Sequence, residues 1–391
     1  LGIFKYFNFF GENLSNLFRL FGFGLDWVTV DILLPVGISF YTFQALSYTI
    51  DVYRGSIAPT HDPVGFFAYV SFFPQLVAGP IERATHLLPQ FHKKRSFDFA
   101  SAVSGTRQIM WGLFKKVVIA DNCAVIVNSV FANYSDVTGS TLFLGAVFFA
   151  FQIYGDFSGY SDIAIGTAKL FGIDLMQNFN YPYFSRNIAE FWRRWHISLT
   201  TWFRDYVYIP LGGSRCGKGR TFRNTAIIFL LSGFWHGANW TFVCWGAYHA
   251  LLFAPLMFLG KNRNFREIVA RDRKLPTVGE TVQMLTTFLL VAFGWIIFRA
   301  NTIGDAWGYI GRLFSKSLLS KPILIGEENT IALVGIFFIV VMLLLEWIFR
   351  REAFVFGGRM SRAAISCAIV FSVFSIYFFG GSSTMFIYFQ F

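Results

Sequence analysis

The stretch Ser232-Gly-Phe-Trp-His-Gly-Ala-Asn-Trp240 lies inside an apolar run, Thr225 to Leu259, that contains no Asp, Glu, Lys or Arg. A helix needs about 20 apolar residues to cross roughly 30 Å of hydrocarbon, so this run suits two short passes. Basic segments flank it at both ends, and we expect the turn near Gly237-Ala-Asn239. A polar group at membrane depth is costly and usually lines a cavity, so His236 is a candidate functional residue.

The composition is that of a polytopic membrane protein. Of 391 residues, 55% are hydrophobic, 20% aromatic and 14% charged, whereas a soluble domain has about 25% charged residues. The mean hydropathy of +0.51 agrees. The net charge of +11 comes from Lys and Arg in short loops, a topology signal rather than a nucleic-acid footprint, so we expect no nucleic-acid partner. The four scattered cysteines show no metal-ligand spacing, so we expect no metal.

Apolar runs separated by basic loops predict an all-α, multi-pass protein with seven to nine passes. The clearest run, Thr330 to Phe349, ends at Arg350-Arg351, and we place such basic loops in the cytoplasm. No internal repeat or linker is visible, so we expect one domain over residues 1–391. The chain begins at Leu1, and we expect further N-terminal spans to be missing from it. The other expected spans or helices are 32–50, 64–79, 100–131, 140–154, 282–298 and 363–379.

The segment Asn187 to Gly213 differs in kind from the apolar runs. Its large apolar residues recur at intervals of 3, 4, 3 and 4, which predicts one helix lying in the plane of the membrane interface. His196 falls on the flank of this stripe, between its aromatic and basic faces. The residues of the stripe are Trp192, Trp195, Leu199, Trp202 and Tyr206.

Two acidic residues, Asp156 and Asp162, directly follow the apolar run 140–154. The small residues between them are poor helix formers, so we expect this segment to be a weak helix core and to line a cavity. Capping of helix ends explains the two acids equally well, and the residues alone leave that choice open.

Four blocks of sequence occur in a characteristic order: Phe73-Pro-Gln-Leu-Val-Ala-Gly-Pro-Ile-Glu-Arg83, Tyr154-Gly-Asp-Phe-Ser-Gly-Tyr-Ser-Asp-Ile-Ala164, Phe191-Trp-Arg-Arg-Trp-His-Ile-Ser-Leu-Thr200 with Arg204 to Gly213, and Ser232 to Trp240. Together they resemble the membrane-bound O-acyltransferase (MBOAT) family. Within it, the chain is similar to the alginate O-acetyltransferase branch, which is related to the D-alanyl transfer protein of teichoic acids. The closing Phe-Ile-Tyr-Phe-Gln-Phe391 resembles the C-terminus of this branch.

The resemblance implies an MBOAT-type helical scaffold with short interfacial helices and a central tunnel. The family's active-site histidine corresponds to His236, and its second motif histidine to His196. The implied reaction moves an acyl group, typically acetyl, from a cytoplasmic thioester such as acetyl-CoA, without a bound cofactor. The implied acceptor is an exported polysaccharide such as alginate, or a periplasmic or extracellular relay protein. The implied location is the bacterial inner membrane, in contact with lipid.

The chemistry of imidazole fits this role at His236. A hydroxyl is a poor nucleophile, and a neutral imidazole that takes its proton contributes about 10²–10⁴ to the rate. The alternative for His236 is a core histidine bonded to a backbone carbonyl. The alternative for His196 is an interfacial histidine with no chemical role. If His196 acts, it either polarises the carbonyl or orients the donor, and that choice stays open.

Further residues are candidates for substrate contacts. Trp235 and Asn239 lie beside His236 in sequence, and Arg193 and Arg194 suit the phosphates of coenzyme A. Each arginine serves equally well as a topology signal or a lipid contact. We expect His249, 13 residues after His236, to be structural.

Two other classes of function remain as alternatives. A transporter or flippase for a polysaccharide or lipid-linked precursor would use Asp156, Asp162 and His236 as a substrate or proton path. The lack of an inverted repeat speaks against it. A structural subunit of an export complex would need neither histidine.

Overall fold

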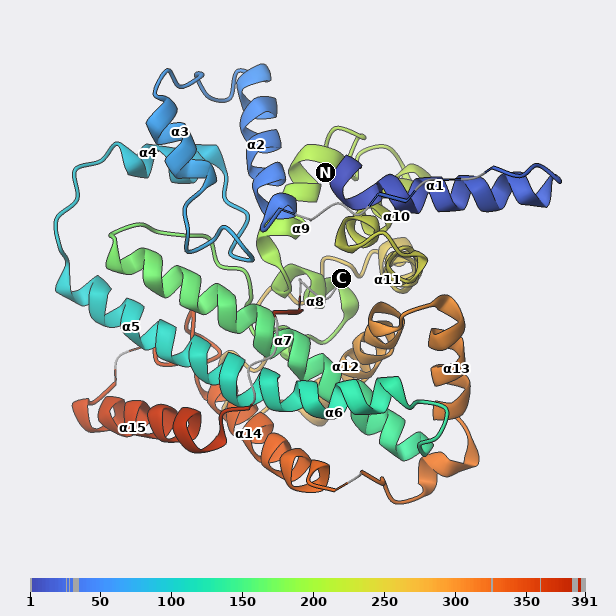
Figure 1. Ribbon diagram of the computed structural model, residues 1–391. Coiled ribbons are helices and arrows are strands. Elements are labelled where there is room, and N and C mark those ends of the chain that lie inside the picture. Colours follow the sequence, from blue (N-terminus) through green and yellow to red (C-terminus); the bar gives the residue numbers. More distant parts are fainter. Residues whose placement is uncertain are drawn as a thin grey trace.

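The computed structural model describes residues 2–25, 27, 29, 30, 35–324, 326–358, 360–381, 386 and 387, and every regular element within them is helical. The expected all-α fold is therefore confirmed. The helices α5, α6 and α7 run through the middle of the molecule, α14 and α15 lie along one side of it, and α1 extends outward on another (Figure 1).

Four helices in the described residues are long and apolar enough to cross a membrane. They are α7 (Gly139–Leu170), α11 (Trp240–Phe258), α12 (Val278–Arg299) and α14 (Glu328–Ile348). This is fewer than the seven to nine passes expected. α15 (Arg362–Phe379) is apolar but shorter. Of the expected span 32–50, residues 32–34 lie outside the described residues, and α2 (Ile38–Tyr53) follows them.

The apolar run 225–259 forms the expected hairpin of two helices. α10 (Lys218–His236) packs against α11, and the turn between them falls at residues 237–239. Asn239 caps the second helix, because its side chain accepts a hydrogen bond from the Thr241 backbone N–H at 3.0 Å. The hairpin thus places His236 at the last position of α10, immediately before the turn.

The segment 154–162 is continuous helix within α7, so the expected weak helix core there is wrong. Its glycines serve packing, because α7 lies directly against α5 (Phe99–Leu113) and the π-helix η1 (Phe114–Ala120). A Cβ on Gly112 would lie 2.6 Å from the Gly159 carbonyl oxygen, and one on Gly166 would lie 2.5 Å from that of Gly105. Glycines that let two backbones approach closely are a common device of membrane helix pairs. The packing of α7 against α5 and η1 thus overrides the low helix propensity of the segment 154–162. The expected cavity lining holds for Ser158, Ser161 and Asp162, which line a small cavity whose wall contains neither of the two motif histidines.

The expected span 64–79 is also wrong. The helix there, α3 (Pro63–Val70), has eight residues, and turns follow it to Gly79. Eight residues rise about 12 Å, much less than a membrane's thickness. Pro74 explains the early end, because a proline disfavours helical backbone at the residue before it and removes a donor.

The segment 187–213 is not one helix, contrary to the periodicity of its apolar stripe. It forms α8 (Ile188–Arg194), α9 (Ile197–Phe203) and the π-helix η3 (Arg204–Tyr208). The break between α8 and α9 falls at Trp195 and His196.

The remaining elements complete the scaffold around one large cluster of buried apolar side chains. A smaller cluster, which includes Tyr69, Leu87 and Ile165, joins the N-terminal helices to α7. The remaining elements are α1 (Gly2–Leu20), α4 (Ala84–Phe91), α6 (Asp121–Ala132), α13 (Ile303–Leu313), and the short 3-10 turns η2 (Pro182–Phe184) and η4 (Lys316–Leu319).

Candidate active site

His196 occupies the break between α8 and α9. Its backbone φ of 44° lies in the left-handed region, which histidine adopts more often than most residues. The loop that precedes α8 supplies hydrogen bonds at the break: the Asn180 N–H donates to the Arg194 carbonyl at 3.0 Å, and the Ile197 N–H donates to the Asn178 carbonyl at 2.9 Å. A left-handed non-glycine residue costs about 1–3 kcal/mol and persists where its neighbours over-determine it. The break buries the imidazole, which is 2% exposed.

His236 is held at the end of α10 by aromatic rings and by a lysine from the first helix. Its ring centroid lies 5.3 Å from that of Trp245 and 5.1 Å from that of Phe298. The Lys5 Nζ donates to the carbonyl oxygens of Trp235, at 3.0 Å, and of His236, at 2.7 Å. The last carbonyls of a helix lack partners within it and favour a nearby cation, so Lys5 caps α10 at the histidine.

One cavity brings the two histidines together. This histidine cavity holds about 460 Å³ of space between atoms, and both His196 and His236 line it. The ring of Trp235 contacts both, with its centroid 6.1 Å from that of His196 and 4.9 Å from that of His236. The other lining residues are Trp192, Trp195, Leu199, Thr200, Phe203, Ile228, Phe229 and Ser232.

A second cavity, the Lys5 cavity, lies on the other side of His236. It holds about 920 Å³, and its wall includes Phe242 and Phe298, whose rings also contact His236. Asn239 lines it and donates to the Asn301 carbonyl at 2.8 Å. His236 itself lines only the histidine cavity, and the Phe242 and Phe298 rings connect it to the wall of the Lys5 cavity. The other described lining residues include two cations and no carboxylate: Phe4, Lys5, Gly237, Ala238, Arg299, Ala300 and Asn301.

The two predicted acids are not brought to the histidines. Asp156 pairs with Lys116 at 2.7 Å and accepts a hydrogen bond from the Ile387 N–H. Asp162 pairs with Lys115 at 2.6 Å. Neither lines the histidine cavity or the Lys5 cavity. The contact at Ile387 falls within the expected C-terminal block, of which residues 388–391 lie outside the described residues.

The two predicted arginines are the last residues of α8, beside the cavity-lining Trp192 and Trp195, but their guanidinium groups bind other parts of the protein. Arg193 donates to the carbonyls of Asn262, at 2.8 Å, and Asn264, at 2.7 Å. Arg194 is buried and pairs with Glu190 at 2.9 Å. Neither arginine lines the histidine cavity.

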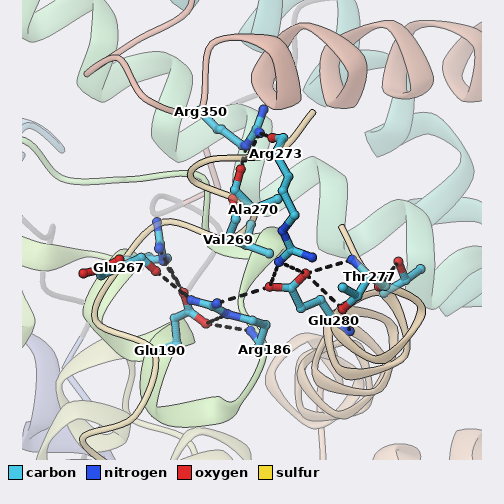
Figure 2. A network of polar contacts seen from close by, with 11 residues as sticks. Arg186, Glu190, Glu267, Val269, Ala270, Arg273, Thr277, Glu280 and Arg350 are labelled. Atoms are coloured by element: carbon cyan, nitrogen blue, oxygen red, sulfur yellow. Dashed lines mark hydrogen bonds and ion pairs between the residues drawn. The ribbon is translucent and has the colours of Figure 1, made fainter. Parts of the chain in front are cut away.

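A wider polar network includes Glu190, the partner of Arg194 (Figure 2). Arg186 lies between Glu190, at 3.1 Å, and Glu280, at 3.7 Å, and Glu280 also binds Arg273 at 2.9 Å. Arg350, two residues after the end of α14, donates to the Ala270 carbonyl at 2.9 Å. These contacts fasten the basic loop 261–277 onto α8 and the start of α12. Much of the positive charge in this region thus stabilises the fold.

The block 73–83 binds the loop before α8 and the start of α9, the two segments that hold His196. Glu82 is fully buried, accepts from the Met176 N–H and lies 2.7 Å from the His86 Nδ1. Burial raises the pKa of the Glu82 carboxyl, and the hydrogen bond to Glu82 raises the pKa of the His86 imidazole. The Ile81 N–H donates to the Ser198 Oγ at 3.0 Å. The first block thereby anchors both the loop before α8 and the start of α9.

Sequence reasoning missed two residues of the site. One is Lys5, for which a lone lysine among phenylalanines is a signal. Asn178, whose Oδ1 lies 3.1 Å from the His196 Nδ1, carried no signal at all. His249 lines neither cavity, and its ring packs 5.0 Å from Trp192 and 5.1 Å from Trp245.

Comparison with known proteins adds independent information about this site. A sequence model of MBOAT, the membrane-bound O-acyltransferase family, matches residues 57–290. The probable alginate O-acetylase AlgI of Pseudomonas aeruginosa is 45% identical over 316 residues, which cover 81% of this chain and 58% of the relative. The peptidoglycan O-acetyltransferase of Helicobacter pylori is 36% identical, covering 78% and 60%. The teichoic acid D-alanyltransferase of Bacillus subtilis is 28% identical, covering 68% and 69%.

The matched region contains both histidines and both halves of the α10–α11 hairpin. The chain spans about three fifths of the length of the alginate O-acetylases and of the peptidoglycan O-acetyltransferase.

Proposed function

The chain belongs to the membrane-bound O-acyltransferase family, and from this premise we propose that it is a membrane-embedded O-acyltransferase. In this proposal it moves an acetyl group from a cytoplasmic thioester toward an exported polysaccharide such as alginate, directly or through a periplasmic or extracellular relay protein. No cofactor is bound, and the donor is acetyl-CoA or another acyl thioester. The proposed location is the bacterial inner membrane.

The observation that carries the proposal is the meeting of His196 and His236 at one cavity. The two residues lie 40 positions apart in sequence on different helices, yet both line the same 460 Å³ space. A histidine that served only as packing would have no reason to share a cavity with the other motif histidine. The names of the relatives, two O-acetylating proteins and one D-alanyltransferase, favour acyl transfer over transport.

The proposed reaction is a single acyl transfer. The acceptor hydroxyl oxygen attacks the carbonyl carbon of the thioester while the His236 imidazole takes the hydroxyl proton. The new C–O bond forms and the C–S bond breaks. The leaving thiolate then takes the proton from the imidazolium, so the enzyme returns to its starting state.

The two cavities support separate approaches for donor and acceptor. The basic segments 213–223 and 261–274 mark the cytoplasmic side, and α10 runs from the first of them to His236. The histidine cavity extends from His236 back along α10 to Ile228, toward that side. We assign it to the donor. The Lys5 cavity lies beyond His236, and we assign it to the acceptor or the relay protein.

Substitution of the histidine tests the proposal. We expect His236→Ala to lower polymer acetylation in cells, and labelled acetyl transfer from acetyl-CoA in membrane vesicles, by at least about 100-fold, because a general base contributes about 10²–10⁴. His249→Phe is the matched control, since His249 is a buried histidine of the next helix that packs among aromatic rings. It should stay within a few-fold of the unsubstituted protein. Normal acetylation by His236→Ala at normal protein abundance would exclude the proposal.

A further inference from the structure

We propose that Asn178 is a positioning residue that holds His196, a residue of the histidine cavity wall, in the Nδ1–H tautomer, so that its Nε2 carries the lone pair. The inference rests on the proposed acyl transfer and goes beyond it, because it decides which kind of group His196 can contact. Asn178 lies in the loop between α7 and α8, 18 residues before His196, and is 1% exposed.

The direction of the hydrogen bonds around Asn178 identifies its oxygen. The Ile81 N–H donates to the Ser198 Oγ at 3.0 Å, so the Ser198 hydroxyl is left to donate, and the atom that accepts it is the Asn178 Oδ1 at 2.8 Å. The Ser198 backbone N–H also points at this oxygen, at 3.4 Å. A backbone N–H can only donate, so the side-chain amide must turn its oxygen toward α9.

The other end of the same amide agrees with this orientation. The Asn178 Nδ2 donates to the Ser161 Oγ on α7 at 3.2 Å. Turning the amide over would point its NH₂ group at the Ser198 N–H, two donors facing each other in a buried site. An unmade hydrogen bond of a buried donor costs about 1–3 kcal/mol, so the observed orientation is strongly preferred.

The orientation of the amide decides the tautomer of His196. The Asn178 Oδ1 carries no proton, and the His196 Nδ1 lies 3.1 Å from it. The imidazole therefore donates through Nδ1–H, and its neutral form has an unprotonated Nε2. The Nε2 has no hydrogen-bond partner among the described residues, and His196 lines the histidine cavity.

The tautomer limits what His196 can do in the reaction. An unprotonated Nε2 accepts a hydrogen bond from an O–H or N–H group, whereas polarising a carbonyl oxygen requires a donor. The sequence leaves two roles open for His196, which are to polarise the carbonyl and to orient the donor. The geometry points to orienting the donor. The Nε2 of neutral His196 would accept from an N–H or O–H group of the thioester donor beside His236.

Nitrogen NMR tests the tautomer without any activity measurement. The protein is labelled with ¹⁵N-histidine and reconstituted in lipid, and the His196 signals are identified by their loss in His196→Gln. We expect one protonated Nδ1 and one unprotonated Nε2 in the unsubstituted protein, and a protonated Nδ1 also in Asn178→Asp, which keeps an accepting oxygen. We expect the pattern to be lost in Asn178→Leu. A protonated Nε2 in the unsubstituted protein would overturn the inference, as would an unchanged tautomer in Asn178→Leu.

Activity provides a second readout with a matched control. Partners that orient a functional histidine typically contribute on the order of tenfold to a hundredfold, so Asn178→Leu should lower acetyl transfer from acetyl-CoA by that factor. Asn178→Asp should restore most of it. Asn224→Leu removes an equally buried asparagine, whose Nδ2 donates to the Leu211 and Gly213 carbonyls, and should leave the His196 signals unchanged. If no acetyl transfer occurs at all, the proposed function fails, while the NMR pattern still decides the role of Asn178.

Discussion

At the scale of single residues, the site depends on side chains that hold the histidines in place. Lys5 binds the backbone at His236, and Asn178 binds the ring of His196. Each support comes from a segment outside the helix that carries its histidine. Substitution of Lys5 or Asn178 should therefore displace the imidazole that this residue holds before it disrupts the fold.

The first prediction concerns Lys5. Lys5→Met removes two charged hydrogen bonds from the end of α10, and such bonds contribute about 1.5–3 kcal/mol each. We expect a lower thermal unfolding midpoint in lipid nanodiscs and reduced acetyl transfer, with both largely retained in Lys5→Arg. Arg19→Met, on the exposed end of the same helix, is the control. Equal behaviour of Lys5→Met and Arg19→Met would refute the capping role.

A second prediction concerns the pH dependence of stability. His86 has a raised pKa because it bonds the Glu82 carboxylate, so its contribution is complete below its unfolded pKa of about 6.5 and is lost as the pH rises through the folded value. Burial raises the pKa of Glu82, which also penalises its charged form as the pH rises. We expect the unfolding midpoint to fall as the pH rises above about 6.5. The slope should be smaller in His86→Gln, and an identical slope would contradict this assignment.

At the scale of helices, close crossings through glycine decide the architecture. A Cβ on Gly159 of α7 would lie 2.8 Å from the Gly112 carbonyl oxygen on α5, and backbone cannot yield as a flexible side chain does. The crossing also sets the register of Lys115 and Lys116 against the acids of α7.

Gly159→Ala should therefore destabilise the protein. Overpacking costs about 1–3 kcal/mol, and we expect a lower unfolding midpoint and less folded protein after detergent extraction. Gly311→Ala is the control, because Gly311 lies within α13 with open space around it, and alanine there favours helix by up to about 1 kcal/mol. The prediction fails if the two alanine variants unfold at the same temperature.

Sequence reasoning succeeded where local composition decides structure and failed where distant contacts do. The hairpin 225–259 was predictable, because a charge-free run with basic flanks has few other solutions. The break at His196 was not, because the apolar period continues across it and the hydrogen bonds that permit it come from Asn178 and Asn180. The segment 154–162 is helical for a similar reason, since its glycines pack on another helix.

The candidate site was likewise predictable where local motifs decide it and not where distant contacts do. His236 and His196 were identified from their motifs, and the structure adds that they share a cavity. Asp156 and Asp162 could not be assigned from sequence, because their lysine partners lie 40 or more residues away on η1. Arg193 and Arg194 are candidates for phosphate by sequence, but Arg193 binds carbonyls of the loop 261–277, and Arg194 pairs with Glu190 one turn earlier in α8.

At the scale of the whole molecule, the basic loops predict the orientation of the chain in the membrane. Arg263 lies in the loop before α12, and Asn301 lies just beyond the other end of this 22-residue helix, which rises about 33 Å. The two positions should therefore face opposite sides of the membrane.

Labelling of introduced cysteines tests this orientation. In spheroplasts, a membrane-impermeant maleimide should label Asn301→Cys and leave Arg263→Cys unlabelled until the membrane is permeabilised. Cys216, in the basic turn before α10, serves as an internal reference for the cytoplasmic side. The reverse pattern would place the histidine cavity on the outer side and exchange the proposed routes of donor and acceptor.

The bond from Lys5 to the His236 carbonyl joins residues 231 positions apart, and this separation affects biosynthesis. Ribosomes add about 5–20 residues per second, so the lysine emerges on the order of ten to fifty seconds before its partner exists. During that interval the nascent first helix must keep an ammonium group solvated, at the lipid surface or against the insertion machinery. The cap at the end of α10 therefore forms only after more than half of the 391 residues have been made.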